Sequence, residues 1–186
     1  MKKRLLALLS AMCVAFCLAA PAFAVSAMYV PAYDETKDYG LVDSGVLDDG
    51  TEYWVINLTP EEVVQHAMSR SYDWSGSVTV PIANKDGTNG AKVGYDFNAY
   101  PDEYVVVEVG NLPSTMPSVN VSFYYTNKSA HDWVSSVGAN AMVVFKLKYP
   151  NNTGYVNVST YESKSVTTQF KLYTSDENPA DGYTEV

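Results

Sequence analysis

Cysteine is almost absent from this chain of 186 residues, because only Cys13 and Cys17 occur and both lie near the amino terminus. The segment around them has the parts of an export signal. Residues 2–4 are basic, residues 5–19 are almost wholly apolar, and residues 21–24 supply small side chains for cleavage. The exported domain is therefore expected to contain no disulfide.

We expect residues 1–24 to be a cleaved signal peptide, which leaves one domain of 162 residues outside the cytoplasm. Export without cysteine is typical of a bacterium. The mature protein would then be secreted, either free or associated with the cell wall. No later segment has the run of about 20 apolar residues that a membrane span needs, so we expect no membrane insertion of the mature chain.

Basic residues are also scarce. Loss of residues 2–4 leaves nine of the 12 basic residues against 21 acidic ones, a net charge of −12. Nucleic acids and anionic membranes bind basic surfaces, so both are disfavoured as partners. Calcium could bind acidic clusters, although none has the spacing of a defined calcium loop. The clusters are Asp34, Glu35 and Asp38, then Asp48, Asp49 and Glu52, and finally Asp176, Glu177 and Asp181.

Catalytic motifs are missing as well. The chain has no G-x-S-x-G elbow, no H-E-x-x-H pair and no glycine-rich phosphate loop. Only two histidines occur: His66, four residues after Glu62, and His131, beside Asp132. Transition-metal sites usually need three or four ligands, so no metal site is predicted. These absences favour a non-catalytic protein.

What the mature chain does have is alternating apolar and polar residues between frequent turns, which is typical of an antiparallel β-sandwich. We therefore predict an all-β fold of the jelly-roll or Ig-like kind, with residues 25–50 as an irregular lead-in that could include one edge strand. The sandwich itself is expected over residues 51–174, and residues 175–186 should form a flexible acidic tail. The expected strands, after one near residues 52–58, are 76–83, 91–97, 103–109, 119–126, 141–149, 154–161 and 165–173.

Turn residues at 86–90 and 150–154 predict antiparallel hairpins, and the last three strands are expected to form a meander. One inward face should run through all three. Its members are Val143, Phe145, Leu147, Val156, Val158, Val166, Thr168, Phe170 and Leu172.

One short helix interrupts this pattern near residues 60–70. Thr59 is a good N-cap, Pro60 suits the first turn, and Glu62 completes a capping box. Val63, Val64, Ala67 and Met68 recur at helical spacing and are expected to be buried. By the same spacing Glu62, His66 and Ser69 should face solvent.

The carboxyl-terminal half, about residues 91–174, resembles the jelly-roll domains called bacterial pre-peptidase C-terminal domains. The resemblance rests on Gly154-Tyr155-Val156-Asn157-Val158 and on Thr168-Gln169-Phe170-Lys171-Leu172, which look like the final hairpin of that family. The acidic loop of the family is absent, since Ser122-Phe123-Tyr124-Tyr125 stands in its place. The resemblance implies a non-catalytic role, and it lends no support to a calcium site in that loop.

Tyrosine is the abundant aromatic residue, with 15 copies. Several tyrosines have the strand parity opposite to the valines, so they are expected on an exposed sheet face that could stack against sugars. High β-propensity is the alternative reason for their abundance. The predicted ligand-binding residues are Tyr104, Tyr124, Tyr155, Tyr161 and Tyr173, together with Trp74 and Trp133 beside loops.

The sequence thus predicts a secreted binding or adhesion module whose partner is a glycan or a surface protein. A small secreted glycoside hydrolase is the enzymatic alternative, with Glu108 as one carboxylate and Glu103 or Glu162 as the other. A third possibility is a structural subunit of a cell-surface assembly, which would make contact through an edge strand or the lead-in.

Overall fold

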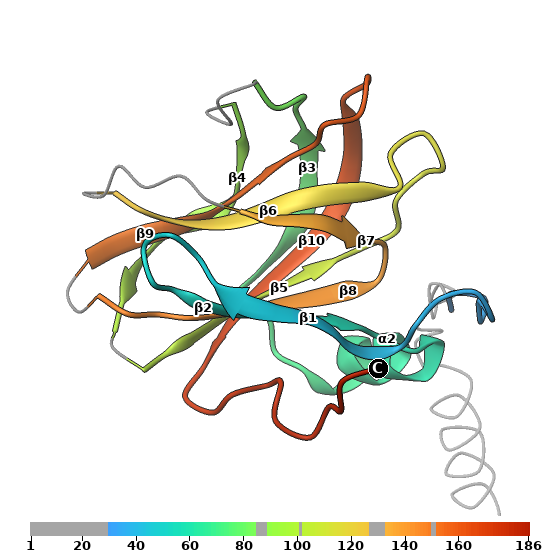
Figure 1. The fold of residues 1–186 in the computed structure, drawn as a ribbon, viewed down its shortest axis with the longest axis horizontal. Helices are drawn as coiled ribbons and strands as arrows, with labels where there is room; N and C mark the ends of the chain where they lie inside the picture. Colours follow the sequence, from blue (N-terminus) through green and yellow to red (C-terminus); the bar gives the residue numbers. More distant parts are fainter. Residues whose placement is uncertain (1–29, 85–88, 101, 127–132, 150–151) are drawn as a thin grey trace, which may run out of the picture.

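The computed structural model describes residues 30–84, 89–100, 102–126, 133–149 and 152–186, so the expected signal peptide with both cysteines lies outside the described residues. Within them, ten strands and one helix alternate with short loops (Figure 1). The strands are β1 Gly40–Val46, β2 Glu52–Asn57, β3 Trp74–Val80, β4 Ala91–Ala99, β5 Tyr104–Val109, β6 Ser118–Tyr125, β7 Val134–Gly138, β8 Ala141–Lys146, β9 Asn152–Ser159 and β10 Val166–Ser175.

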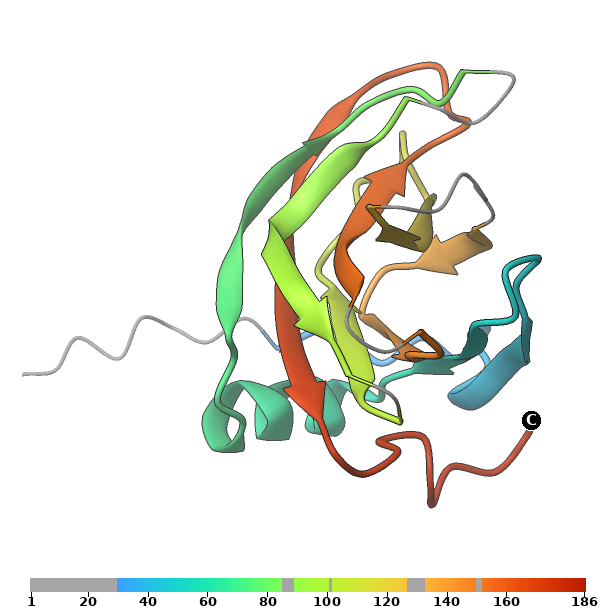
Figure 2. The same cartoon turned by 90° about the vertical axis from the view of Figure 1, so that its left-hand side faces the viewer.

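Two antiparallel sheets face each other. The larger sheet has the strand order β1-β2-β8-β5-β10-β3, and the smaller has the order β4-β9-β6-β7. Figure 2 shows both sheets strongly curved, with β4 beside β3 where one sheet follows the other. The predicted all-β sandwich with one short helix is confirmed.

Valine and phenylalanine side chains from both sheets fill the space between them, which we call the central core. The inward positions expected on the last three strands lie there, including Phe145 on β8, Val156 on β9 and Phe170 on β10. Each fully buried side chain of this size contributes roughly 1.5–3 kcal/mol to stability. The period-two pattern therefore predicted the inward face correctly.

The predicted meander is wrong. Strand β8 lies between β2 and β5, β9 lies between β4 and β6, and β10 lies between β5 and β3. These three consecutive strands thus alternate between the sheets. The links from β3 to β4 and from β8 to β9 join strands of different sheets, so the predicted hairpins do not form there, although residues 85–88 and 150–151 of these links lie outside the described residues. All three strands face the same core, so alternation reports which side of a strand is buried but not which strand is its neighbour.

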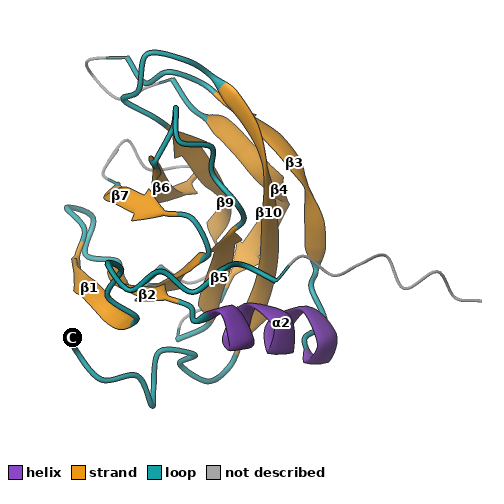
Figure 3. Ribbon diagram, turned by 90° about the vertical axis from the view of Figure 1, so that its right-hand side faces the viewer, coloured by secondary structure: helices purple, strands orange, loops and turns teal. Residues whose placement is uncertain are grey.

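Helix α2, Pro60–Ser69, begins as the sequence predicts. The Thr59 side chain accepts a hydrogen bond from the Glu62 amide at 3.2 Å, and the Thr59 amide donates to Glu62 Oε2 at 2.8 Å. Figure 3 shows the helix against the β5–β10 side of the molecule, away from β6 and β7. It covers a second apolar group on the outer face of the larger sheet, the outer cluster: Ile56, Leu58, Val106, Met142, Val144, Tyr173 and Ala180, with Val63, Tyr72, Tyr104 and Tyr183 packed against them.

The buried face of the helix differs from the prediction. His66 is buried, with 7% of its surface exposed, whereas Met68 is 75% exposed and Ala67 is also exposed. Val63 keeps its expected contact with the outer cluster. The helix is rotated about its axis because the His66 imidazole has a carboxylate partner in the sheet, Glu108.

The carboxyl-terminal segment also differs, because it is docked rather than free. Ala180 is buried and Tyr183 packs on the outer cluster. Glu185 forms a parallel bridge with Leu41, so the segment lies along the edge of β1. At the amino-terminal end of the chain, β1 is the edge strand that the sequence predicted within the lead-in. The sandwich therefore begins before residue 51.

Candidate functional site

The predicted tyrosines do not form one surface. Tyr104 and Tyr173 lie on the outer side of the larger sheet, Tyr124 and Tyr155 lie on the outer side of the smaller sheet, and Tyr161 follows the end of β9. Their strand parity is as expected, since none of them belongs to the central core. The two outer faces, however, point away from each other.

The expectation that Tyr104 and Tyr173 are exposed is wrong. Tyr173 is only 7% exposed, and its ring meets Tyr72 edge-on with 5.9 Å between centroids. Tyr104 packs beside Trp54 at 6.2 Å. Helix α2 and the docked carboxyl-terminal segment cover this face, a tertiary contact that strand parity does not reveal. These two tyrosines are structural.

Trp74 is also structural. Its half-buried ring packs against the central core and lies so close to Gly76 that a Cβ there would be 2.6 Å from Trp74 Cζ2. Trp133, just before β7, is half-buried. Its proposed role as a ligand platform stays a prediction.

On the outer side of the smaller sheet, β6 and β9 place polar side chains in three cross-strand pairs, which we call the polar ladder. The pairs are Asn120–Ser159, Ser122–Asn157 and Tyr124–Tyr155. The two tyrosine rings are nearly parallel, at 10°, with centroids 5.6 Å apart. Tyr124 is buried, contrary to the expectation from sequence, and Tyr155 is half-buried.

The polar ladder contains hydrogen-bonding atoms without partners in the described structure, although native proteins satisfy nearly all such buried atoms. Asn120, Ser122, Asn157 and Ser159 are each more than nine-tenths buried. Asn120 Nδ2 and Ser159 Oγ have no partner among the described residues, whereas the side chains of Ser122 and Asn157 hydrogen-bond to the Tyr124 hydroxyl. Burial raises the pKa of the neighbouring Tyr124, so its hydroxyl stays neutral and able both to donate and to accept.

Strand β4 supplies the rim of this face. Lys92 Nζ lies 4.5 Å from the centroid of the Tyr155 ring and donates to Asp96 Oδ1 at 2.6 Å. Between these two residues Gly94 has a φ of +72°, which lets the strand bulge. Tyr155, Lys92 and Asp96 together present an aromatic ring, a cation and a carboxylate beside the amide of Asn157.

The sequence contains a signal for the polar ladder. Asn-x-Ser-x-Tyr at 120–124 and Tyr-x-Asn-x-Ser at 155–159 contain the same three polar residue types at alternate positions, with the tyrosine at opposite ends. On two antiparallel strands this order places the tyrosines opposite each other and each asparagine opposite a serine. Recognising it would have required pairing β6 with β9, which the expected meander did not allow.

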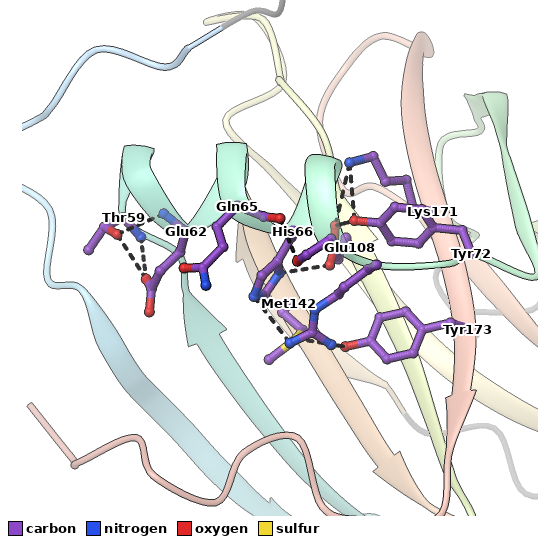
Figure 4. A network of polar contacts seen from close by, with 11 residues as sticks. Thr59, Glu62, Gln65, His66, Tyr72, Glu108, Met142, Lys171 and Tyr173 are labelled. Atoms are coloured by element: carbon purple, nitrogen blue, oxygen red, sulfur yellow. Dashed lines mark hydrogen bonds and ion pairs between the residues drawn. The ribbon is translucent and has the colours of Figure 1, made fainter.

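A second polar constellation surrounds Glu108 beneath helix α2 (Figure 4). His66 Nδ1 lies 2.9 Å from Glu108 Oε1, and the Tyr72 hydroxyl donates to Glu108 Oε2 at 2.9 Å. Lys171 Nζ is 3.7 Å from Oε2 and donates to the Tyr72 hydroxyl at 3.3 Å. Three different elements therefore converge on one carboxylate.

Arg70, the C-cap residue of α2, determines which ring nitrogen of His66 carries the proton. A guanidinium only donates hydrogen bonds, so His66 Nε2, which is 3.1 Å from Arg70 Nη2, must accept. The proton then lies on Nδ1, which donates to Glu108. Arg70 also donates to the Tyr173 hydroxyl, which in turn donates to Met142 Sδ. Both nitrogens of His66 are thus occupied, and neither is available as a catalytic base.

The electrostatics of Glu108 do not suit a glycosidase acid, whose pKa must be raised. Burial alone would raise the pKa of Glu108, but hydrogen bonds from His66 and Tyr72 and nearby positive charge hold it below its ordinary value of 4.5. Glu103 precedes β5, about 16 Å along the strand from Glu108 at 3.3 Å per residue. Glycosidase carboxylates lie within about 10 Å of each other. Glu162 follows β9, a strand of the other sheet.

Calcium has no evident site in the described part of the chain, where no group of three or more potential metal-binding side chains comes together. Several of the acidic side chains instead close local turns. Asp34 Oδ1 accepts from the amide and hydroxyl of Thr36, and Asp49 Oδ1 accepts from the amide of Thr51. Asp181 accepts from the Asn178 side chain.

None of the helices among the described residues is long and apolar enough to cross a membrane. Comparisons of the chain with protein-family models, with curated proteins and with solved structures find no match. The case for function therefore depends on the geometry of the polar ladder and of the Glu108 constellation.

Proposed function

We propose that this protein is a secreted, non-catalytic binding module that recognises carbohydrate through the outer side of its smaller sheet, with Tyr155 at the centre. The observation that carries the proposal is the stacked pair of Tyr124 and Tyr155 on the same face as two buried polar atoms, Asn120 Nδ2 and Ser159 Oγ, that have no partner among the described residues. An outer sheet face normally has either exposed polar residues or an apolar cover. This one is polar, closely packed and incompletely hydrogen-bonded.

Carbohydrate is the ligand class that suits such a face. A sugar ring offers apolar C–H groups to an aromatic ring and hydroxyls to its surroundings. Half-buried Tyr155 can provide the aromatic contact, while Lys92, Asp96 and Asn157 border it with donors and acceptors. An unsatisfied buried polar group costs about 1–3 kcal/mol, so a ligand hydroxyl or bridging water that reached the ladder would stabilise the complex.

A non-catalytic role is supported by the Glu108 constellation, in which the polar side chains already have one another as partners. Its carboxylate, imidazole and guanidinium bond to one another beneath helix α2. Secretion is supported by the basic and apolar leader, and the resemblance to pre-peptidase C-terminal domains also favours a non-catalytic role. A glycoside hydrolase has no comparable observation in its favour.

The test is a glycan array and polysaccharide pull-down with residues 25–186, with and without calcium, followed by analysis of released sugars. Tyr155→Ala should reduce binding by about tenfold or more, the typical effect of losing one stacking aromatic. Tyr33→Ala is the matched control, because Tyr33 is 64% exposed on the amino-terminal segment. Unchanged binding by Tyr155→Ala, or no retained glycan at all, would contradict the proposal, and released sugars would make the protein an enzyme.

A further inference from the structure

The Tyr155 ring already has a neighbour on each side. Strand β9 lies between β6 and β4, so side chains from both strands reach the ring. Tyr124 on β6 stacks against it, and the Lys92 ammonium on β4 lies over it, 4.5 Å from its centroid. A ligand that stacks on Tyr155 from the β4 side therefore meets a ring face that a cation already occupies.

A bulge in β4 builds this ammonium seat, which consists of the Tyr155 ring and the Asp96 carboxylate. Between two of its pairs with β9, β4 takes four residue steps, over residues 93–97, while β9 takes two. A regular strand would separate positions 92 and 96 by about 13 Å. The bulge shortens that separation, so Lys92 Nζ reaches Asp96 Oδ1 at 2.6 Å. The irregular backbone thus brings a carboxylate and an aromatic ring together around one ammonium group.

The ammonium seat holds the charged residues of the smaller sheet. Its four described strands contain one basic residue, Lys92, and one acidic residue, Asp96. Their side chains are 41% and 46% exposed, and exposed ion pairs contribute little to stability. The Lys92 ammonium can therefore leave for solvent at low cost, and a ligand that brings its own ammonium keeps Asp96 paired.

On the basis of the carbohydrate binding proposed above, we propose that the ligand is an amine-bearing glycan whose ammonium group replaces that of Lys92 between Tyr155 and Asp96. The exchange makes and breaks no covalent bond. One ammonium takes the place of another, and the sugar ring lies against the tyrosine face that Lys92 leaves. Acidic residues outnumber basic ones in the exported chain, which attracts a cationic glycan over a distance.

Other ligands suit the ammonium seat less well. The carboxylate of an acidic sugar placed over Tyr155 would face Asp96 and the negative face of the ring. A neutral sugar would displace Lys92 without giving Asp96 a new partner. A lysine-rich peptide carries several ammonium groups, but the described strands of this sheet have no second carboxylate to receive them.

The test is isothermal titration calorimetry of residues 25–186 with a glucosamine oligomer and with an N-acetylglucosamine oligomer of the same length. The pH is chosen so that the sugar amines are protonated. We expect the glucosamine oligomer to bind about fivefold more tightly or better, because only it brings an ammonium to Tyr155 and Asp96. Equal affinity, tighter binding of the acetylated oligomer, or no binding of either would overturn the proposal.

Substitutions in the ammonium seat give opposite expectations. Asp96→Asn should weaken binding of the glucosamine oligomer by about threefold or more, whereas Lys92→Gln should strengthen it by about twofold or more, because the competing ammonium is gone. The matched controls are Asp102→Asn and Lys146→Gln, which remove the same charges from an exposed ion pair on the larger-sheet side. Both should leave the dissociation constant unchanged.

Weaker binding by Lys92→Gln would contradict the proposal, because Lys92 would then hold the ligand itself, as it would for an acidic sugar. Tighter binding of an oligolysine peptide than of the glucosamine oligomer would also overturn it. Tyr155→Ala tests the proposed function separately. If Tyr155→Ala abolishes binding of a retained glycan while the two oligomers bind equally, carbohydrate binding stands and only the amine-bearing ligand is rejected.

Discussion

Glu108 lies on a strand whose other residues are mostly buried valines, and its carboxylate is bound by residues from three parts of the chain. His66 comes from helix α2, Tyr72 from the segment before β3, and Lys171 from β10. A buried ion pair adds little net stability by itself, but removing one member leaves the others buried without a partner. At the residue scale, the constellation fixes how the helix sits on the sheet.

Glu108→Leu should therefore lower the free energy of unfolding by about 3 kcal/mol, at the low end for a broken buried pair because Lys171 is partly solvated. Glu177→Gln, at an exposed position, should change it by less than about 0.5 kcal/mol. Urea denaturation followed by tryptophan fluorescence measures both. An equal, small effect of the two substitutions would show that the constellation does not hold the helix.

Acid should weaken the same contact. The pKa of Glu108 is lowered in the folded protein, so its contribution is complete above the unfolded value of 4.5 and is lost as the pH falls through the lower folded value. Stability should thus fall more steeply below pH 4.5 in the unaltered protein than in Glu108→Gln. Urea midpoints taken at successive pH values compare the two, and parallel curves would contradict the assignment.

At the scale of elements, the sequence correctly predicted the features that depend on residues close together in the chain. The capping box of α2 and the inward parity of β8, β9 and β10 follow from spacing along the chain. The sheet that each strand joins does not, because strands of both sheets bury the same kind of residue in the same core. The prediction of the buried face of α2 was wrong for a related reason, because His66 is buried against Glu108, a partner 42 residues away in the chain.

The capping box can be tested by itself. Thr59→Ala removes the acceptor for the Glu62 amide and should cost about 1 kcal/mol, which lowers the melting temperature by about 2–4 °C in a chain of this size. The exposed Ser163→Ala is the control and should cause no measurable change. Thermal unfolding followed by circular dichroism gives both values. A shift in Ser163→Ala as large as that in Thr59→Ala would remove the case for the cap.

At the scale of the whole molecule, the two outer sheet faces are different. Helix α2 and the carboxyl-terminal segment cover the larger sheet with apolar contacts, whereas the smaller sheet presents the polar ladder. The sequence identified tyrosines that point away from the central core, but it did not show which of the two outer faces is covered. The helix and the carboxyl-terminal segment that cover the larger sheet are distant in the chain from the strands that they cover. Tyr173 and Tyr155 have equivalent parity and different surroundings for this reason.

The docked carboxyl-terminal segment makes a prediction at this scale. Deleting residues 180–186 removes Ala180 and Tyr183 from the outer cluster and should lower the free energy of unfolding by about 2 kcal/mol. Burial and the nearby Glu62 carboxylate raise the pKa of Tyr183 to about 12, as expected for a packed phenol. Urea denaturation measures the loss. A truncated chain as stable as the full one would mean that the segment does not hold the cover in place.

The most direct test of the central claim is to map where a sugar binds, by nuclear magnetic resonance of residues 25–186 with an oligosaccharide retained in the pull-down. We predict that the shifted amides cluster around Tyr155, Lys92 and Asn157, on the outer side of β4 and β9. Shifts centred on helix α2, on the edge of β1 or on the amino-terminal segment would contradict the account.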